Sequence, residues 1–415
     1  MVSAVRMISE YAARCVAALS LLALPLAGMT ATPPLAAGAA ASGGLALTLD
    51  GGGAAGDGVT LDNGPLQALL NSVPASGATV QVKAGRYLLN APLLIQSNTQ
   101  LVCSPGATFV AARPWTRGAD LFLLENRNHG TRSIIDQNLT VEGCYFDFTN
   151  QDKGDFHAIN FRMARHVRIS QAHCLKGGDC TAMMATDDTL VEDSDATGIR
   201  NACWDHWEGA TRGVVRGGHC EAVGAGSGVF VTGGGHGPGT GGRGQTASGF
   251  VIEGGTYSIQ GTGLGIWIMG LGFPGEKNAA SHIQIGDTVI DLGSAGHPCF
   301  KISGAGTDIS VTNFTCKGGN GGAFYVGGGG DNGGAPSNVT IANGVIDGAT
   351  VTKAVSLITV DDGADNVSIR NVRATNSRGY LYGIDMADDR TSVAGNSITP
   401  GRLGLYRVRR RLGGR

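Results

Sequence analysis

The sequence is poor in charged and aromatic side chains. Charged residues make up 15% of its 415 positions and aromatic residues 6%, whereas about a quarter of the residues in ordinary soluble domains are charged. No C-x-x-C pair or Cys/His cluster with zinc spacing occurs, so we expect no metal site. No G-x-x-x-x-G-K-[ST] segment occurs either, which excludes a P-loop nucleotide site.

Positive charge is scarce except at the ends of the chain. The net charge is −2; residues 1–41 carry +1 and residues 401–415 carry +6, which leaves −9 for residues 42–400. An acidic body argues against nucleic acid as a partner. We expect the Arg-rich residues 399–415 to form a disordered tail, with binding to an anionic surface as the alternative.

A long apolar run occurs only near the N-terminus. CVAALSLLALPLAGM, residues 15–29, follows two arginines and precedes small residues with A-x-A-like sites. The run is too short for a comfortable membrane span. We interpret residues 1–40 as a secretory signal peptide, with a retained anchor as the alternative. The protein is then expected to be secreted or periplasmic, without stable membrane insertion after cleavage.

Eight of the nine cysteines lie beyond this segment. An even number of cysteines in an exported protein predicts disulfide bonds. Cys203/Cys220 and Cys299/Cys316 share a spacing of 17 residues, but the connectivity stays open.

Glycine is abundant, at 69 residues, and it accompanies a short repeat. Each copy has two apolar residues alternating with polar ones and ends near Gly, Asn or Asp. The copies are NLTVEG (from Asn138), HVRISQ (His166), DTLVED (Asp188), RGVVRG (Arg212), GFVIEG (Gly249), HIQIGD (His282), DISVTN (Asp308), NVTIAN (Asn338) and NVSIRN (Asn366). Alternation with period 2 predicts strands with one buried face, and Asn, Asp and Gly tolerate left-handed turns.

A second strand lies between successive copies, as in FHAINFR, CWDHWEG, GIWIMG and AFYVGG. Two or three short strands in every 22–37 residues, without amphipathic helices, predict an all-β parallel solenoid. The spacing is too short for propeller blades. The one expected helix follows Asn63, with Leu66, Leu69, Leu70 and Val73 on one face, and it would cover the first coil. We therefore predict a single solenoid domain over residues 41–398.

Residues 56–109 resemble the N-terminal entry of the pectate-lyase-like superfamily of right-handed parallel β-helices. The matching segments are Gly56-Asp57-Gly58-Val59, Asp62, Ala84-Gly85-Arg86-Tyr87 and Ser97-Asn98-Thr99-Gln100-Leu101. The resemblance implies the fold; it leaves the activity open, because the superfamily includes hydrolases, lyases, epimerases and non-catalytic modules.

The outer positions of one stacked sheet in such a fold can form a long groove. We align each second strand on the Gly or Ala that ends it. Asp205 and Trp207 then face inward, and the outward set is Asn160, Arg162, Trp204, His206, Glu208, Phe230, Thr232, Trp267, Met269, Lys301, Ser303 and Tyr325. A slip of one residue would reverse this frame.

The segment NACWDHWEG concentrates candidate catalytic groups in this groove. Glu208 could supply one of the two carboxyl groups of a glycosidase, and Asp205, Asp187, Asp188 or Asp179 the other. His206 could adjust or replace one of them. Trp204, Trp267 and Tyr325 would stack on sugar rings, and Asn160, Arg162 and Lys301 would bind hydroxyl or carboxylate groups. The alternative is that the tryptophans only pack and the charges only face solvent.

The polygalacturonase family within the superfamily offers a closer comparison. Gly178-Asp179-Cys180-Thr181-Ala182 resembles the start of its G-D-D-C-x-A strand, with one of the two aspartates. Neither N-T-D-G nor R-I-K occurs, and G-H-G occurs only in the Gly-rich loop 233–244. The first hypothesis is a monomeric polysaccharide hydrolase without a cofactor. The alternatives are a uronate lyase, which could need Ca²⁺, and a non-catalytic carbohydrate-binding or surface protein.

Overall fold

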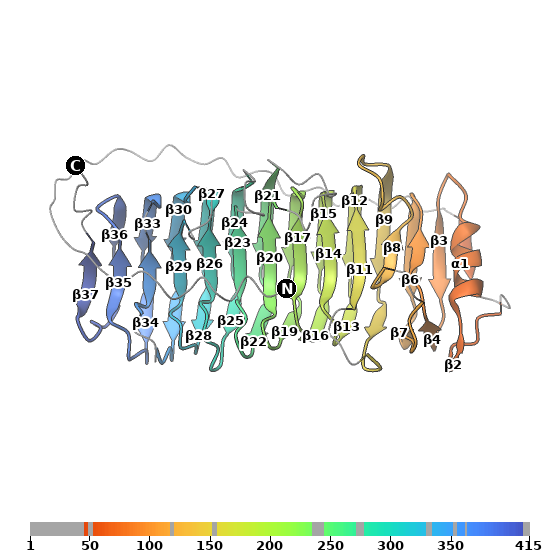
Figure 1. Cartoon of the computed structure of the whole chain (residues 1–415), viewed down its shortest axis with the longest axis horizontal. Coiled ribbons are helices and arrows are strands. Elements are labelled where there is room, and N and C mark those ends of the chain that lie inside the picture. Colours follow the sequence, from red (N-terminus) through yellow and green to blue (C-terminus); the bar gives the residue numbers. More distant parts are fainter. Residues whose placement is uncertain are drawn as a thin grey trace.

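The described part of the chain forms a long stack of coils in which the strand pairs are parallel, and a helix lies at its N-terminal end (Figure 1). The computed structural model describes residues 45–48, 53–116, 120–151, 156–234, 245–270, 278–328, 334–351, 355–361 and 363–409. The predicted signal peptide lies outside these residues, as do nearly all of the loop 233–244 and the last six residues. Three sheets run along the stack, and each full coil contributes one strand to each sheet.

The strands of each sheet follow one another in chain order. Sheet A contains β1 (Leu45–Thr48), β3 (Ala78–Val82), β6 (Thr99–Cys103), β9 (Asp136–Glu142), β12 (Ala164–Ser170), β15 (Asp187–Glu192), β18 (Thr211–Arg216), β21 (Thr246–Glu253), β24 (Ala279–Gly286), β27 (Ala305–Thr312), β30 (Ser337–Ala342), β33 (Asp365–Arg370) and β36 (Thr391–Ala394). Sheet B contains β2 (Asp57–Leu61), β4 (Gly85–Leu89), β7 (Ala107–Ala111), β10 (Tyr145–Asp147), β13 (His173–Leu175), β16 (Asp195–Ile199), β19 (His219–Ala222), β22 (Thr256–Ile259), β25 (Val289–Asp291), β28 (Thr315–Lys317), β31 (Val345–Asp347) and β34 (Arg373–Thr375). Sheet C contains β5 (Leu93–Ile95), β8 (Phe122–Asn126), β11 (His157–Arg162), β14 (Asp179–Met184), β17 (Ala202–Trp207), β20 (Ser227–Thr232), β23 (Ile266–Met269), β26 (Phe300–Ser303), β29 (Phe324–Gly327), β32 (Ile358–Val360), β35 (Tyr382–Met386) and β37 (Gly404–Val408).

The sequence repeat corresponds to sheet A. All nine copies fall on its strands, from β9 to β33. The first residue of every copy has a positive φ, for example Asn138 at 57° and Asn366 at 49°. Asn, Asp and Gly dominate this position because they adopt the left-handed conformation at little cost. The second-strand segments all fall on sheet C, so the predicted parallel solenoid is confirmed.

The core lies inside the stack, where equivalent side chains of successive coils contact one another. Val229, Ile266, Phe300 and Phe324 pair in register on sheet C and are buried. The rings of Phe300 and Phe324 stack with centroids 4.6 Å apart. No single coil encloses enough apolar area to fold alone, so the stacking itself creates the core.

Disulfide bonds connect the sheets, as predicted from the even cysteine count. The four bonds are Cys103–Cys144, Cys174–Cys180, Cys203–Cys220 and Cys299–Cys316. The two pairs with a spacing of 17 residues are therefore both bonded. In each of these two, the bond joins the start of a sheet C strand, β17 or β26, to the next strand of sheet B, β19 or β28.

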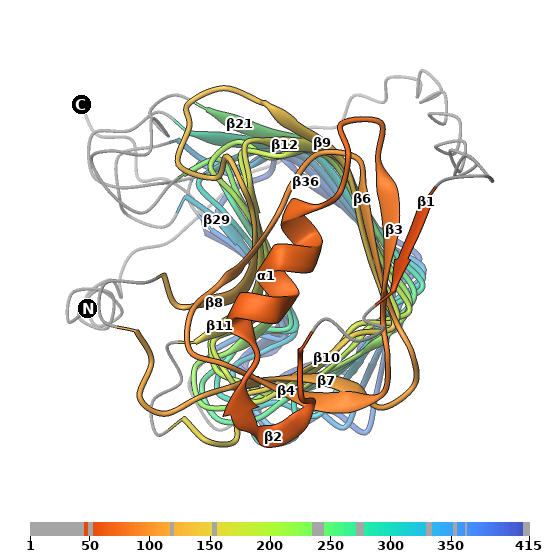
Figure 2. The ribbon, with the colours of Figure 1, turned by 90° about the vertical axis from the view of Figure 1, so that its right-hand side faces the viewer.

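Helix α1 (Asn63–Asn71) covers the N-terminal end of the stack (Figure 2). Leu66, Leu70 and Val73 are buried against the first coil. Gln67 also exchanges two hydrogen bonds with the backbone of Leu94, at 3.0 and 2.8 Å. The helix thus shields the apolar interior and satisfies backbone groups of the end strand β5, which has no preceding coil to pair with.

The C-terminal boundary differs from the prediction. Residues 399–415 were expected to be a disordered tail, but Gly404–Val408 form β37, which pairs with β35. Two of the arginines have acidic partners: Arg409 lies 2.9 Å from Asp361 and 3.1 Å from Asp385, and Arg407 also pairs with Asp385. A run of arginines resembles a solvated tail when the acids that it contacts are more than twenty positions away in the sequence.

Candidate functional site

The outer face of sheet C carries a row of polar and aromatic side chains in register. Successive strand pairs align Glu125, Asn160, Ala182, Asp205, Phe230, Trp267, Lys301, Tyr325, Thr359 and Asp385. We call this set the outer row. Adjacent strands lie about 4.8 Å apart, so residues from coils far apart in the sequence form one continuous surface.

The predicted frame is right for most of the sheet and wrong for β17. Phe230, Trp267, Lys301 and Tyr325 belong to the outer row, as expected, and Asn160 precedes them in it. On β17, however, Trp204 pairs with the core residue Val229, and Asp205 pairs with Phe230.

The exchange of faces on β17 reverses four predicted orientations. Trp204 and His206 point into the core, whereas Asp205 and Trp207 lie on the outer face. The cause is Glu208, which has a φ of 56° and occupies the turn position that Gly304 fills in a later coil, so that Gly209 lies one residue further along. Alignment on the glycine therefore moved the frame by one residue, which reverses every side chain in a strand.

Asp205 is a buried acid of the outer row. It is 3% exposed, and its Oδ1 atom has no hydrogen-bond partner among the described residues. Burial raises the pKa of the Asp205 carboxyl well above its usual range, and the negative charge of Asp179 raises it further. A carboxyl in this environment holds its proton at pH values at which an ordinary aspartate is ionised.

Asp179 lies at the start of β14 and fixes the corner of the following coil. Its Oδ1 atom accepts hydrogen bonds from Asn201 Nδ2, at 2.7 Å, and from the Ala202 backbone N–H, at 2.8 Å. His157 Nδ1 lies 2.8 Å from its Oδ2 atom. Asp179 thus supports the strand that carries Asp205 and also acts on that residue electrostatically.

His206 does not reach the outer face. Its side chain is buried against Phe250, with ring centroids 5.0 Å apart, and neither ring nitrogen has a hydrogen-bond partner among the described residues. Burial lowers the pKa of His206 to about 3. The ring is therefore an uncharged part of the core, as is Trp204, and neither occupies the groove position that the sequence suggested.

Glu208 and Arg162 form an ion pair on the outer side of sheet C. Arg162 Nη2 lies 3.1 Å from Glu208 Oε2, and the Glu208 side chain is fully buried. Arg162 belongs to β11 and Glu208 follows β17, so the pair bridges the intervening strand β14. A buried carboxylate needs such a charge partner. The contact places the Glu208 carboxylate next to the outer face, beside Arg162.

The middle of the outer row is aromatic and cationic. Trp267 packs on Phe230, with centroids 4.9 Å apart, and Lys301 Nζ lies 4.2 Å from the centre of the Trp267 ring. Burial lowers the pKa of Lys301 to about 8. Tyr325 Oη lies 3.2 Å from Asp361 Oδ2. Flat rings beside a cation form a surface suited to a sugar chain that carries negative charge.

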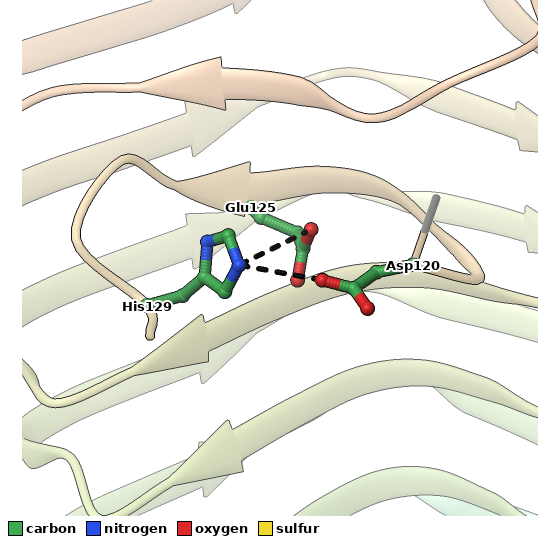
Figure 3. Close-up of side chains that lie close together, drawn as sticks. All are labelled: Asp120, Glu125 and His129. Atoms are coloured by element: carbon green, nitrogen blue, oxygen red, sulfur yellow. Dashed lines mark ion pairs between the residues drawn. The ribbon is translucent and has the colours of Figure 1, made fainter. Parts of the chain in front are cut away.

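Sequence reasoning missed a second group at the other end of the row. Asp120, Glu125 and His129 converge around β8, and Glu125 is 1% exposed (Figure 3). Asn160, predicted to bind substrate, instead donates from Nδ2 to Glu125 Oε1 at 3.0 Å. Burial raises the pKa of Glu125 to about 7. The signal was the acid and histidine four residues apart in LLENRNHG, which no zinc-type spacing rule would select.

Comparison with known proteins identifies the fold class. No protein-family model and no curated protein sequence matches the chain. Among solved structures, the A-module of mannuronan C-5 epimerase AlgE4 from Azotobacter vinelandii is similar, with a TM-score of 0.65 and 17% identity over 87% of this chain and 99% of that one. A family 28 exopolygalacturonase from Yersinia enterocolitica gives a TM-score of 0.58 and 11% identity, over 88% of this chain and 78% of that one.

A third similar structure is a surface adhesin. PfbA of Streptococcus pneumoniae gives a TM-score of 0.55 and 14% identity, with 88% of this chain and 99% of that one covered. The chain thus has the right-handed parallel β-helix fold that these solved structures share. Within the described residues, no helix is both long and apolar enough to cross a membrane.

Proposed function

We propose that the outer row of sheet C binds an anionic polysaccharide and that the protein hydrolyses it, with Asp205 as the proton donor. The observation that carries this proposal is the environment of Asp205, a carboxyl on the outer face whose pKa is raised by burial and by the charge of Asp179. Glycosidases need one carboxyl that keeps its proton and a second that is ionised. The electrostatic influence of Asp179 on Asp205 supports Asp179 as the second group.

The neighbouring part of the row supports the choice of substrate. Trp267 and Phe230 offer apolar faces to sugar rings, and Lys301 adds a positive charge. Trp267 lies two strands from Asp205 along the row, and Lys301 lies three strands from it. Arg162 adds a further cation on the outer face, although Glu208 already neutralises part of its charge. A sugar chain bound along the row would place one glycosidic oxygen beside Asp205.

A β-elimination reaction is the second candidate, and Lys301 favours it. A lysine with a pKa of about 8 exists partly as the free amine near neutral pH and can remove a proton next to a uronate carboxylate. Hydrolysis and elimination give different products, because only elimination leaves an unsaturated sugar that absorbs ultraviolet light.

One experiment separates these reactions. The full chain is incubated with a panel of uronate polysaccharides, and reducing ends and ultraviolet absorbance are measured in parallel for the wild type, Asp205→Asn and Lys301→Ala. Hydrolysis predicts reducing ends without absorbance and a loss in Asp205→Asn. Absorbance that disappears in Lys301→Ala would replace hydrolysis by elimination, and binding without any product would leave a carbohydrate-binding protein.

The cellular location belongs to the same proposal. Four disulfide bonds form and persist in oxidising surroundings. They support export of the protein to the periplasm or the cell exterior, where a polysaccharide would be accessible.

A further inference from the structure

Three side chains at the N-terminal end of the outer row point toward one another (Figure 3). Glu125 belongs to β8, Asp120 precedes this strand and His129 follows it in the next turn. His129 Nε2 lies 3.3 Å from Asp120 Oδ2 and 4.0 Å from Glu125 Oε2. One ligand atom from each residue lies within 4.8 Å of the other two.

The orientation of His129 aims its Nε2 atom at the two carboxylates. Its Nδ1 atom lies 2.9 Å from the backbone oxygen of Asn126. A carbonyl can only accept, so Nδ1 carries the hydrogen, and Nε2 of the neutral ring is left with a lone pair. Metal-binding histidines show this arrangement, in which a backbone carbonyl or carboxylate fixes the distant ring nitrogen.

The turn that positions His129 is held rigidly. Asp136 accepts hydrogen bonds from Asn126 Nδ2, at 2.7 Å, and from the Asn128 backbone N–H, also at 2.7 Å. Asn126 Nδ2 also donates to the backbone oxygen of Arg162 on the next coil, at 2.9 Å. The carbonyl of Asn126 is therefore fixed by the sheet, and with it the histidine ring.

Asn160 of the next coil contacts the cluster and has an unpartnered buried oxygen atom. The residue is 3% exposed and lies opposite Glu125 in the next strand. Its Nδ2 atom donates to Glu125 Oε1 at 3.0 Å, yet its Oδ1 atom is buried without a partner among the described residues. A buried amide oxygen normally has a hydrogen-bond donor or a cation beside it.

We propose that Asp120, Glu125 and His129 bind a divalent transition-metal ion, Zn²⁺, with Asn160 supporting the site from the next coil. This proposal differs from the sequence analysis, which predicts no metal site. Zinc–ligand distances of about 2.0–2.2 Å place tetrahedral ligand atoms roughly 3.4 Å apart, which is close to the His129–Asp120 separation of 3.3 Å. Imidazole favours zinc over Ca²⁺, which takes oxygen ligands.

The site is distinct from the proposed catalytic position. Glu125 lies three strands from Asp205 along the outer row, or about 14 Å at the usual strand spacing. Three protein ligands leave a fourth position for water or for an oxygen of a bound molecule. Asp120 is largely exposed, with 59% of its side chain accessible, so this position can be reached from solvent.

Zinc binding by the full chain tests this inference directly. The protein is prepared without a polyhistidine tag, stripped with a chelator, and titrated with Zn²⁺ against a chromogenic zinc chelator. We expect a single tight site per chain that weakens at least about tenfold in His129→Ala and in Glu125→Gln. The matched control is His282→Ala, because His282 Nε2 faces a single carboxylate, Asp308, at 3.5 Å.

Folding is checked by circular dichroism and by thermal unfolding of each stripped variant. A His129→Ala protein that folds and binds Zn²⁺ as tightly as the wild type contradicts the proposal. Absence of binding by the folded wild type contradicts it as well, and it would make the three residues an ion-pair cluster around a protonated histidine. Zinc is the only ligand in this titration, so the result is independent of polysaccharide cleavage.

Discussion

Two parts of the outer row share one backbone register but differ in chemistry. The part from Glu125 to Asp205 is buried and, apart from Ala182, polar, whereas the part from Phe230 to Tyr325 is aromatic or cationic and only half-buried. The strands beneath both parts are parallel; the inward positions are apolar under Phe230 to Tyr325, whereas Thr181 and His206 also occupy inward positions in the other part. The difference shows that the backbone register determines only where a side chain lies. The residue type at each position of the row determines its chemistry.

The largest expected effect concerns the polar part. Asp205→Asn removes the proposed proton donor while it preserves shape, and we expect kcat to fall by about 10²–10⁴-fold. Because activity needs the protonated carboxyl, the wild-type rate should fall as pH rises through the raised pKa of Asp205. Initial rates across pH measure both effects.

The exposed Asp291→Asn on sheet B is the control for this substitution, and it should retain activity. Glu208→Gln should lose less activity than Asp205→Asn, because Glu208 acts through its contact with Arg162. If Glu208→Gln is the more damaging of the two, the assignment of roles on β17 is wrong.

The next prediction tests the two faces of sheet C through stability. Trp204 is buried in the core, so Trp204→Ala should lower the free energy of unfolding by about 3–5 kcal/mol. Trp267 lies on the outer row and is partly exposed. Trp267→Ala should therefore lower the free energy of unfolding by clearly less than Trp204→Ala. Denaturant unfolding of both variants gives the comparison, and equal losses would contradict the observed frame.

Trp267→Ala should instead affect binding. A stacked sugar ring loses its apolar partner, and we expect polysaccharide affinity to fall about fivefold, equivalent to roughly 1 kcal/mol. Affinity electrophoresis or calorimetry measures this change. Trp115→Ala is a matched control, because Trp115 packs edge-on against Phe156 and lies outside the outer row; unaltered binding by Trp267→Ala would remove the aromatic part from the site.

The smallest effect concerns the charge of Lys301. Its pKa of about 8 lies below the usual value for lysine, so the side chain loses its charge as pH rises from 7 to 9. Affinity for an anionic polysaccharide should therefore decrease a few-fold over this range. Lys301→Ala should bind more weakly at pH 7 and lose the pH dependence, whereas a dependence that persists in this variant would exclude Lys301 as its source.

The same change in the charge of Lys301 has the opposite effect on stability: affinity falls as pH rises, whereas the free energy of unfolding increases. Burial depresses the folded-state pKa of Lys301, so the unfolded chain binds more protons between the folded and the unfolded pKa. The free energy of unfolding should rise with pH across that interval, from about 8 upward. Denaturant unfolding at pH 8 and pH 10, compared with Lys301→Met, isolates this contribution.

The fold was predictable because its signals are local and repeated. The alternation in segments such as NVTIAN and GIWIMG identifies strands of sheets A and C, and the left-handed residues at Asn338 and Asn366 mark where each coil turns. The frame of β17 was not predictable in the same way. A single residue in the left-handed conformation, Glu208, separates the strand from the glycine used to align it.

The sequence by itself determined a parallel β-solenoid with a capping helix and with disulfide bonds, because period-2 alternation, turn residues and an even cysteine count need no knowledge of distant contacts. Only the tertiary structure decided which groups meet. Coil stacking brings Asn160 beside Glu125, and Arg409 beside Asp361, although tens of residues separate them in the chain. The register that sets these contacts depends on the length of every intervening turn, and a change of one residue reverses the face on which a side chain lies.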